Sequence, residues 1–300
     1  WGSGGWTDDD YAVPMQLWVE KHDFGAKELL RGVVIPARAP TVANGRRDIE
    51  DALRCLFEHP NCGPFIGRQL IQFLVTSNPT TGYVARVAAV FADNGAGVRG
   101  DLGAVVQAIL LDEEARDARY HLGSPRFGRL KEPVQRTMAL ARLARLDRHA
   151  NLLWWDWGSY YAAAFQGPTF SPSVFNFYRP DYQPPGLLTQ HGLAGPAFQI
   201  ADSYACISFP NLLWDQVLDG FVLYGSYAFP PDYADLLAVA DQPEVLVDLV
   251  NLLCCAGGMT APTRDALLVR INQVPAVERL TRVQLAVYVG MTCPEGAVQR

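Results

Sequence analysis

The sequence lacks the short motifs by which several classes of enzyme are recognised. Its six cysteines include no C-x-x-C pair, the spacing of zinc and thioredoxin-type sites. None of its five histidines forms an H-x-x-H or H-E-x-x-H pattern, so the sequence predicts no metal site. It contains no G-x-S-x-G turn, which would present a serine nucleophile. We therefore expect no metal and no cofactor, and leave open whether the chain is an enzyme.

Long apolar runs and an excess of positive charge are also absent. The longest apolar run, around residues 246–256, is broken by Asp248 and Asn251 and is shorter than the roughly 18 residues of a membrane-spanning helix. The net charge is −6, which argues against a nucleic-acid or anionic-membrane surface. Hydrophobic residues make up 49% and charged residues 19% of the chain, a balance typical of globular proteins. We expect a globular protein with no membrane span and no nucleic-acid partner.

Sustained strand alternation is missing as well, and helical periodicity takes its place along most of the chain. We therefore predict an all-α fold, a multi-helix orthogonal array, with only short strand candidates such as 32–35. The predicted helices cover 48–57, 65–75, 83–93, 102–111, 127–146, 197–218, 232–239, 243–255, 263–271 and 277–289.

Changes in composition divide the sequence into four segments. Residues 1–47 form an irregular N-terminal segment, and because the chain opens at Trp1 without a methionine, we expect it to be part of a longer chain. Residues 48–150 form a helical subdomain, residues 151–195 an aromatic, proline- and glycine-rich connecting loop, and residues 196–300 a C-terminal helical subdomain. We expect these segments to pack into one compact unit. A connecting loop as long as residues 151–195 usually wraps a surface or serves a function.

Local signals at three helix ends are specific enough to interpret. Residues 95–100 match G-x-G-x-x-G, but a helix and not a strand precedes them, so they predict a helix–loop–helix corner with Asp101 as the N-cap. Pro133 suits the first turn of its helix or a small kink. Ser77 or Asn78 could cap a helix whose first turn holds Pro79.

The most unusual stretch is SPSVFNFYRPDYQPPG at residues 171–186. Together with a tryptophan-rich segment before it, it supplies the aromatic and cationic groups that bind sugars or partner proteins. If buried, the same rings are the core of a long loop. Arg68, Arg129 or Arg179 could tie this loop to the helical body, and Arg68 and Gln69 are polar residues in an otherwise apolar helix. The predicted binding residues are Trp154, Trp155, Trp157, Phe175, Phe177, Tyr178, Arg179 and Tyr182.

Catalytic and cross-linking candidates remain isolated in the sequence. His59, His191, Ser171 and Ser173 are the candidates for catalysis, but each also has a structural role open to it. A histidine can be hydrogen-bonded in the fold, and Ser171 or Ser173 can cap a short helix over residues 175–178. Cys55 and Cys62 lie seven residues apart around a predicted helix break, so an oxidising compartment would permit a disulfide between them.

Several long blocks in the same order resemble the DUF1800 family. They are FGAKELL at 24–30, HPNCGPFIGRQLIQFLVTSNP at 59–79, the block at 95–112, KEPV at 131–134 and the stretch at 171–186. The resemblance implies a mainly helical, exported bacterial protein of unknown function. It also implies a task shared with the DUF1501 family, whose genes often lie beside those of the resembled proteins. It carries over no catalytic residues.

These observations favour an exported structural or interaction protein of the cell surface or extracellular space, acting with a partner or as a homo-oligomer. A DUF1501-family protein, a second copy of the chain and a glycan are the candidate partners. Two alternatives stay open. One is a secreted hydrolase of a polymer such as a glycan, and the other is a carbohydrate-binding protein that uses exposed tryptophans.

Overall fold

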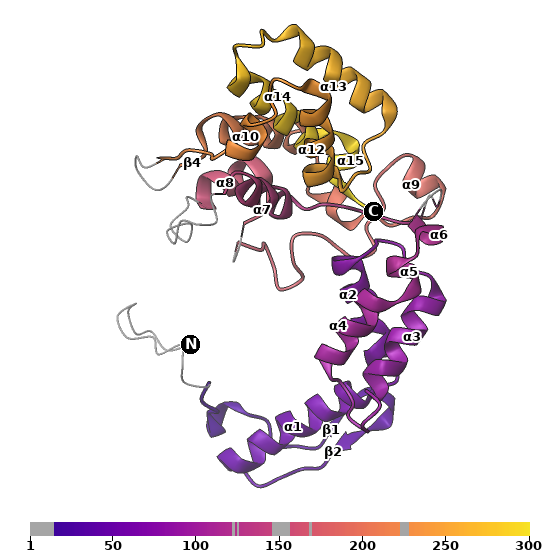
Figure 1. The fold of residues 1–300 in the computed structure, drawn as a ribbon. Coiled ribbons are helices and arrows are strands. Elements are labelled where there is room, and N and C mark those ends of the chain that lie inside the picture. Colours follow the sequence, from indigo (N-terminus) through magenta and orange to yellow (C-terminus); the bar gives the residue numbers. More distant parts are fainter. Residues whose placement is uncertain (1–14, 122–123, 125, 146–156, 168–169, 223–227) are drawn as a thin grey trace. The chain divides into compact units, whose positions relative to one another are not determined.

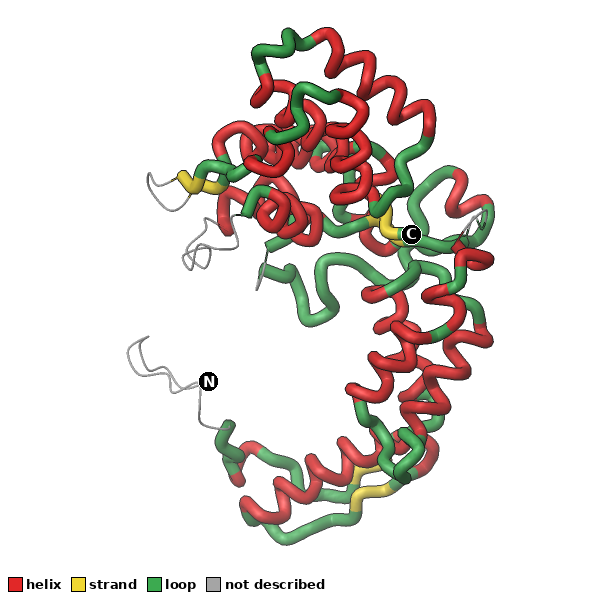
Figure 2. Tube along the Cα trace, viewed as in Figure 1, coloured by secondary structure: helices red, strands yellow, loops and turns green. Residues whose placement is uncertain are grey.

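The computed structural model describes residues 15–121, 124, 126–145, 157–167, 170–222 and 228–300 (Figure 1). Helices dominate these residues, as Figure 2 shows, so the predicted all-α class is confirmed. Strands within them are two residues long and form antiparallel pairs. The pairs are β1 (Lys27–Glu28) with β2 (Val34–Ile35), β3 (Arg129–Leu130) with β6 (Val298–Gln299), and β4 (Phe221–Val222) with β5 (Ala228–Phe229).

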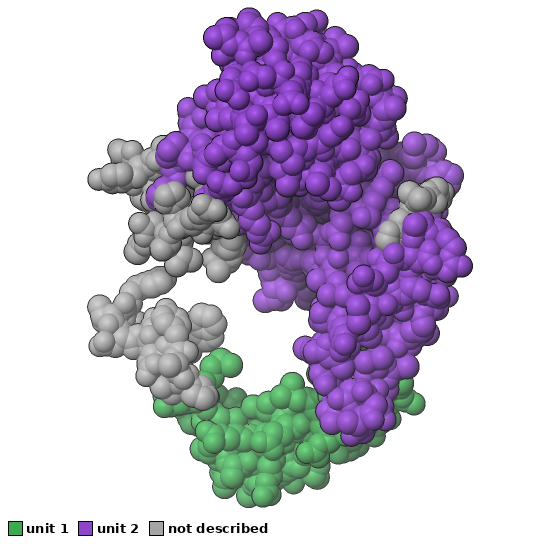
Figure 3. All heavy atoms as spheres, viewed as in Figure 1, with its two compact units in different colours: residues 1–66 green, residues 67–300 purple. Residues whose placement is uncertain are grey.

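The chain divides into two compact units, residues 1–66 and 67–300 (Figure 3). The boundary falls inside the predicted segment 48–150, and the predicted division at 47, 150 and 195 does not coincide with it. Helix α2 (Cys62–Leu74) begins in the first unit and continues into the second. The boundary falls within this helix, between Ile66 and Gly67, and the helix continues across it without a break.

The first unit contains η1 (Val19–Lys21), the β1–β2 pair joined by η2 (Leu30–Gly32), and helix α1 (Val42–Glu58). The side chain of Thr41 caps α1 by accepting a hydrogen bond from the backbone N–H of Asn44 at 3.2 Å. The helix therefore begins six residues before the predicted start at Asp48. Asp48 consequently lies in the interior of the helix, where its side chain is buried.

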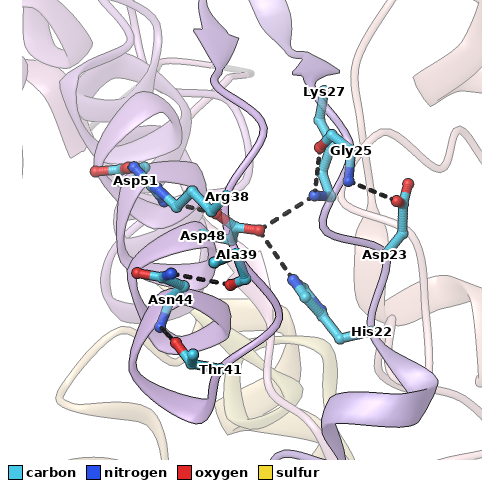
Figure 4. A network of polar contacts seen from close by, with 10 residues as sticks. All are labelled: His22, Asp23, Gly25, Lys27, Arg38, Ala39, Thr41, Asn44, Asp48 and Asp51. Carbon is cyan, nitrogen blue, oxygen red and sulfur yellow. Dashed lines mark hydrogen bonds and ion pairs between the residues drawn. The ribbon is translucent and has the colours of Figure 1, made fainter.

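Asp48 is the centre of a polar cluster that joins α1 to the chain before it (Figure 4). Its Oδ2 accepts from Nε2 of His22 at 2.9 Å and from Nζ of Lys27 at 3.1 Å. Its Oδ1 accepts from Nη1 of Arg38 at 2.5 Å, and the same guanidinium donates to Asp51. The hydrogen bond from His22, helped by those from Lys27 and Arg38, lowers the pKa of Asp48 to about 2 against the effect of its burial. The cluster fixes the irregular N-terminal segment to α1.

The second unit opens with a small helical layer, in which α3 (Thr81–Ala92) packs beside α4 (Leu102–Leu111) (Figure 1). Short helices α5 (Glu113–Arg116) and α6 (Ala118–His121) follow. Tyr83, on α3, is fully buried, and its hydroxyl donates a hydrogen bond to the carbonyl of Ile109 on α4 at 2.6 Å. The corner between α3 and α4 has the predicted form, since Asp101 accepts a hydrogen bond from the N–H of Ala104 and caps α4.

Helices α12 (Pro243–Cys255), α13 (Ala261–Gln273) and α14 (Arg279–Thr292) pack together in a larger bundle, with α10 (Ala205–Asp219) against α14 and α8 (Trp157–Ala164) against α10. Its core contains Leu213, Leu246, Val250 and Val287, all fully buried. The other elements in this part of the chain are α7 (Pro133–Leu143), α9 (Leu187–Gln190), η5 (Pro196–Gln199), α11 (Ala234–Leu237) and α15 (Pro294–Ala297).

Two predicted helices differ from the observed ones for tertiary reasons. The predicted helix 127–146 is shortened to α7 because its first residues form β3 and pair with β6 near the end of the chain. The predicted helix 197–218 is divided into η5 and α10. Conversely, α8 and α9 lie in the segment 151–195 that was predicted to be largely irregular. Pro133 occupies the first turn of α7, as predicted.

Candidate functional site

A pocket in the second unit lies where α2, β3 and η5 meet the aromatic–proline loop, residues 170–186. Its empty space measures about 450 Å³, including the open mouth. The lining combines aromatic and proline rings with amide, hydroxyl and guanidinium groups. The lining residues are Gln69, Gln72, Phe73, Ser77, Arg129, Leu130, Phe175, Asn176, Tyr178, Pro180, Pro196 and Ala197.

Helix α2 forms one wall because Gln69, Gln72 and Phe73 follow one another at spacings of three and four residues and so share a face. Gln72 is buried, and its Nε2 donates to the carbonyl of Ser77 at 3.0 Å and to that of Pro180 at 3.1 Å. One amide thus holds both the turn after α2 and the aromatic–proline loop. Gln69 was noticeable in the sequence as a polar residue in an apolar helix; Gln72 carried the same signal and was missed.

Arg129, on β3, forms the floor of the pocket. It is 5% exposed. Its Nη1 donates to the carbonyls of Gln72 and Phe73 at the end of α2, and its Nη2 donates to Oε1 of Gln135. A carboxylate oxygen of Glu132 lies 3.6 Å from the guanidinium. Burial lowers the pKa of Arg129, with Glu132 opposing. Of the three arginines predicted to tie the loop to the helical body, Arg129 is the buried one, and its connection to the loop runs through Glu132.

Glu132 connects this floor to the loop through Tyr178. Tyr178 is buried, and burial, followed by the nearby charge of Glu132 and a hydrogen bond to it, raises the tyrosine pKa. Its ring lies 6.2 Å from that of Phe73, centroid to centroid. Glu132 also accepts from Nε2 of Gln166. A partly buried carboxylate with a cationic and two neutral partners holds the base of the loop in one position.

A second clamp holds the chain beyond the loop, after α9. The side-chain amide of Asn78 donates to the carbonyl of Ala194 at 2.9 Å and accepts from the N–H of Ala194 at 2.8 Å. Asn78 is therefore not the helix cap that its sequence context suggested, and neither is Ser77. Thr80 caps α3 instead, through a hydrogen bond from the N–H of Tyr83.

Between these fixed ends the tip of the loop is exposed. Val174 is 94% and Phe175 81% exposed. Asn176 follows with φ +75°, a left-handed conformation that turns the chain back toward Tyr178. The predicted helical cap is wrong, because residues 175–178 form no helix. Ser171 instead donates to the carbonyl of Ser173, whose hydroxyl accepts from the N–H of Phe175.

Two polar atoms in the pocket wall have no hydrogen-bond partner among the residues that the structure describes. They are Oε1 of Gln72, an acceptor, and Nε of Arg129, a donor. A buried polar atom without a partner costs about 1–3 kcal/mol. A bound group that offered one donor and one acceptor would recover this cost if it reached both atoms.

The other predicted binding residues have separate positions. Phe177 is half-buried, with its ring 6.5 Å from that of Tyr161. Arg179 is exposed beside Asp181, and its backbone N–H donates to Gln199. Tyr182 is half-buried. The tryptophans Trp154 and Trp155, and the side chain of Trp157, lie outside the described residues.

The four catalytic candidates do not line this pocket. His59 belongs to the first unit, where its Nδ1 accepts from the N–H of Asn61 at 3.1 Å. His191 is exposed at the end of α9. The hydroxyls of Ser171 and Ser173 are engaged in the turn of their own loop. The structure therefore does not bring the serines and histidines together at the pocket.

The cysteine pair predicted to form a bridge is not joined in the structure. Cys55 and Cys62 are both free thiols. The Sγ of Cys55 donates to the carbonyl of Leu30 at 3.9 Å, while Cys62 begins α2. The spacing that permitted a disulfide does not impose one, because each cysteine is held by a different element.

Metal-ligating clusters and membrane-spanning helices are both absent from the part of the chain that the structure describes. No group of three or more histidine, cysteine, aspartate or glutamate side chains in those ranges could hold a metal ion. None of the helices in the same ranges combines the length and the apolar character needed to cross a membrane.

Comparison with protein families places the chain. Residues 4–297 match the family described as "Protein of unknown function (DUF1800)", so the chain belongs to that family. Searches of curated proteins and of solved structures found no significant match. The blocks at 59–79 and 171–186 carry part of the resemblance to this family. Both contribute to the pocket, since Gln72 and Tyr178 line it.

Proposed function

We propose that this chain is an exported protein that binds another protein through the tip of the aromatic–proline loop and the adjoining pocket. The partner is a second copy of the chain or another exported protein, for which the resemblance suggests a member of the DUF1501 family. One observation carries the proposal: an exposed apolar tip stands on a base that is fixed from two sides.

Exposed apolar side chains on a fixed scaffold are the usual anchors of protein interfaces. Val174 and Phe175 are largely exposed, while Tyr178 and Pro180 are held by Glu132 and Gln72. Because the base is already ordered, little conformational entropy is lost when the tip binds. The concave surface beside Phe175 offers a partner both a ring to cover and amide groups to bind.

The two alternatives have weaker support. A hydrolase would need a nucleophile with a base beside it, and the hydroxyls of Ser171 and Ser173 are used within their own turn. A carbohydrate-binding protein would stack sugars on exposed rings, and Phe175 is such a ring, with Asn176 beside it in the pocket. The experiment below separates this second alternative from the proposal.

The test is site-specific photo-crosslinking. The photoreactive residue p-benzoylphenylalanine replaces Phe175, and in a matched control it replaces Val277, which is 86% exposed and lies elsewhere in the same unit. Each purified variant is irradiated alone and then with the extracellular fraction of the source cells. We expect a discrete protein adduct from position 175 and none from position 277, followed by its identification by mass spectrometry.

The competing outcomes are distinct. Adducts that carry sugar and no second protein would support the carbohydrate-binding alternative and refute the proposal. Equal adduct yields from positions 175 and 277 would show that the tip has no special affinity. Export is tested separately, by fractionating the source cells and locating the chain with an antibody.

A further inference from the structure

Three cysteines gather in the core of the second unit, away from the pocket. Cys254 and Cys255 end α12, and Cys293 lies between α14 and α15. All three are buried. The sulfurs of Cys255 and Cys293 are 3.7 Å apart, and both approach the carbonyl oxygen of Gly290, at 3.7 Å and 3.6 Å. The contact joins elements that are 38 positions apart in the chain.

We propose that Cys255 and Cys293 form a disulfide that fastens α12 to the α14–α15 turn. A disulfide has a sulfur–sulfur length of about 2.05 Å, so rotation of the two side chains has to bring the sulfurs together by roughly 2 Å. The proposal is independent of the aromatic–proline loop and of its partner. It requires only that the chain meet an oxidant of the disulfide class.

The surroundings make the two thiols unequal. The hydrogen bond from Cys255 lowers the pKa of Cys293 to about 7, although burial opposes this, and the same contact raises the pKa of Cys255. The ammonium group of Lys131 lies near the two thiols, because its Nζ donates to the carbonyl of Cys254 at 3.2 Å and to that of Gly296 at 2.9 Å. Because the thiolate is the nucleophile in disulfide exchange, Cys293 is the residue that reacts first.

The reaction balances in two exchanges. The Cys293 thiolate attacks a sulfur of an external disulfide, such as oxidised glutathione, and releases one glutathione thiolate while a mixed disulfide forms. The Cys255 thiol then loses its proton and attacks Sγ of Cys293, which releases the second glutathione thiolate. Two protein thiols are oxidised, one external disulfide is reduced to two thiols, and the two protons that the protein thiols give up are taken up by the two glutathione thiolates. Since both sulfurs are buried in the folded chain, the exchange takes place as the contact between Cys255 and Cys293 forms, before α12 and α14 are fully packed.

Cys254 is the nearest competitor for the bridge. It is next to Cys255 in the sequence, but the 3.7 Å contact with Sγ of Cys293 is made by Cys255, and burial in the folded chain raises the pKa of Cys254 to about 12. The proposal therefore assigns the bridge to Cys255 and leaves Cys254 as a thiol.

The experiment uses the full chain, unfolded in denaturant with reductant and refolded in a mixture of reduced and oxidised glutathione. After acid quenching, free thiols are labelled with N-ethylmaleimide, and the protein is analysed by intact mass and by fragmentation of its peptides. We expect two fewer labels than on the fully reduced chain, and a linked peptide in which Cys254 carries a label and Cys255 does not. Cys255→Ser should abolish the link, and Cys254→Ser should keep it.

Three results would overturn the proposal. They are a full set of labels after refolding in oxidised glutathione, a bridge that contains Cys254, and a stable glutathione adduct on Cys293 without ring closure. If Cys255→Ser does not fold, the peptide map of the unaltered chain decides the assignment by itself. A chain oxidised while still in denaturant is the control for random pairing, and since six cysteines allow 15 complete pairings it should contain the Cys255–Cys293 link in only about one chain in five.

Discussion

Replacing Arg129 with methionine tests whether the floor of the pocket holds the loop in place. Methionine has a similar length and no charge, so it fills much of the space and removes every hydrogen bond that the guanidinium makes. The carbonyls of Gln72 and Phe73 lose their shared donor. Glu132 keeps its bond from Gln166 but loses the guanidinium that lies 3.6 Å away. A negative charge is then left at a partly buried position.

The expected cost follows from this burial. Removing one partner of a buried ion pair lowers the free energy of unfolding by about 3–5 kcal/mol. For a unit of this size, 1 kcal/mol corresponds to roughly 2–4 °C in melting temperature. We therefore expect Arg129→Met to melt about 10 °C below the unaltered chain, and the aromatic–proline loop to be cut earlier by a protease because its base is released.

Arg179→Met is the matched control. Arg179 lies on the same loop, but its side chain is 69% exposed and its carboxylate neighbour is 3.8 Å away, so we expect a cost below about 1 kcal/mol. Differential scanning calorimetry and timed proteolysis of the two variants supply the measurement. The reasoning is refuted if Arg129→Met melts within 2 °C or so of Arg179→Met, or if its loop is cut no faster.

Two further predictions concern acid stability and one turn. Asp48, with its pKa near 2, stabilises the first unit above the usual carboxyl pKa of about 4, and this stabilisation is lost as the pH falls through 2. The protection of peptides from residues 15–66 against hydrogen exchange, relative to the intrinsic rate at each pH, should therefore fall between pH 4 and pH 2, and Asp48→Asn, unlike the half-exposed control Asp51→Asn, should have low protection already at pH 6; equal protection in both variants would contradict this. Gly220 has φ +81°, and a Cβ there would lie 1.7 Å from the carbonyl oxygen of Phe229, so Gly220→Ala should lower the free energy of unfolding in urea by about 3 kcal/mol or more. The control Gly97→Ala, with positive φ but open space, should cost about 1–2 kcal/mol, and a similar cost for the two would refute the steric argument.

The helices that could be predicted from the sequence are those whose limits are set locally. The bounds of α4 match the prediction because Asp101 caps it, and those of α12 match because Pro243 begins it. Where the limits depend on distant residues the prediction fails. Nothing near Arg129 indicates that it starts a strand, because its partner is Gln299.

The candidate site was predictable in composition but not in arrangement. The aromatic–proline stretch and the neighbouring arginines stand out by residue type alone. Which arginine is buried depends on packing between α2 and β3, and the amide of Asn78 meets Ala194, 116 positions away. A local pattern cannot encode such a partner, so Asn78 was interpreted as a helix cap, the role that its neighbours in the sequence favour. The same holds for Asp48 and His22, which come together over 26 positions.

The short pairing of β3 with β6 has a consequence for the order in which the chain can fold. Gln299 not only faces Arg129 in this pair but also donates its side-chain amide to the carbonyl of Leu74, 225 positions earlier. The pairing of β3 and the hydrogen bond to the end of α2 therefore form only after Gln299 has been synthesised. During synthesis on the ribosome the aromatic–proline loop is made before β3 has its partner strand, so its apolar side chains stay open to chaperones until Gln299 has been added.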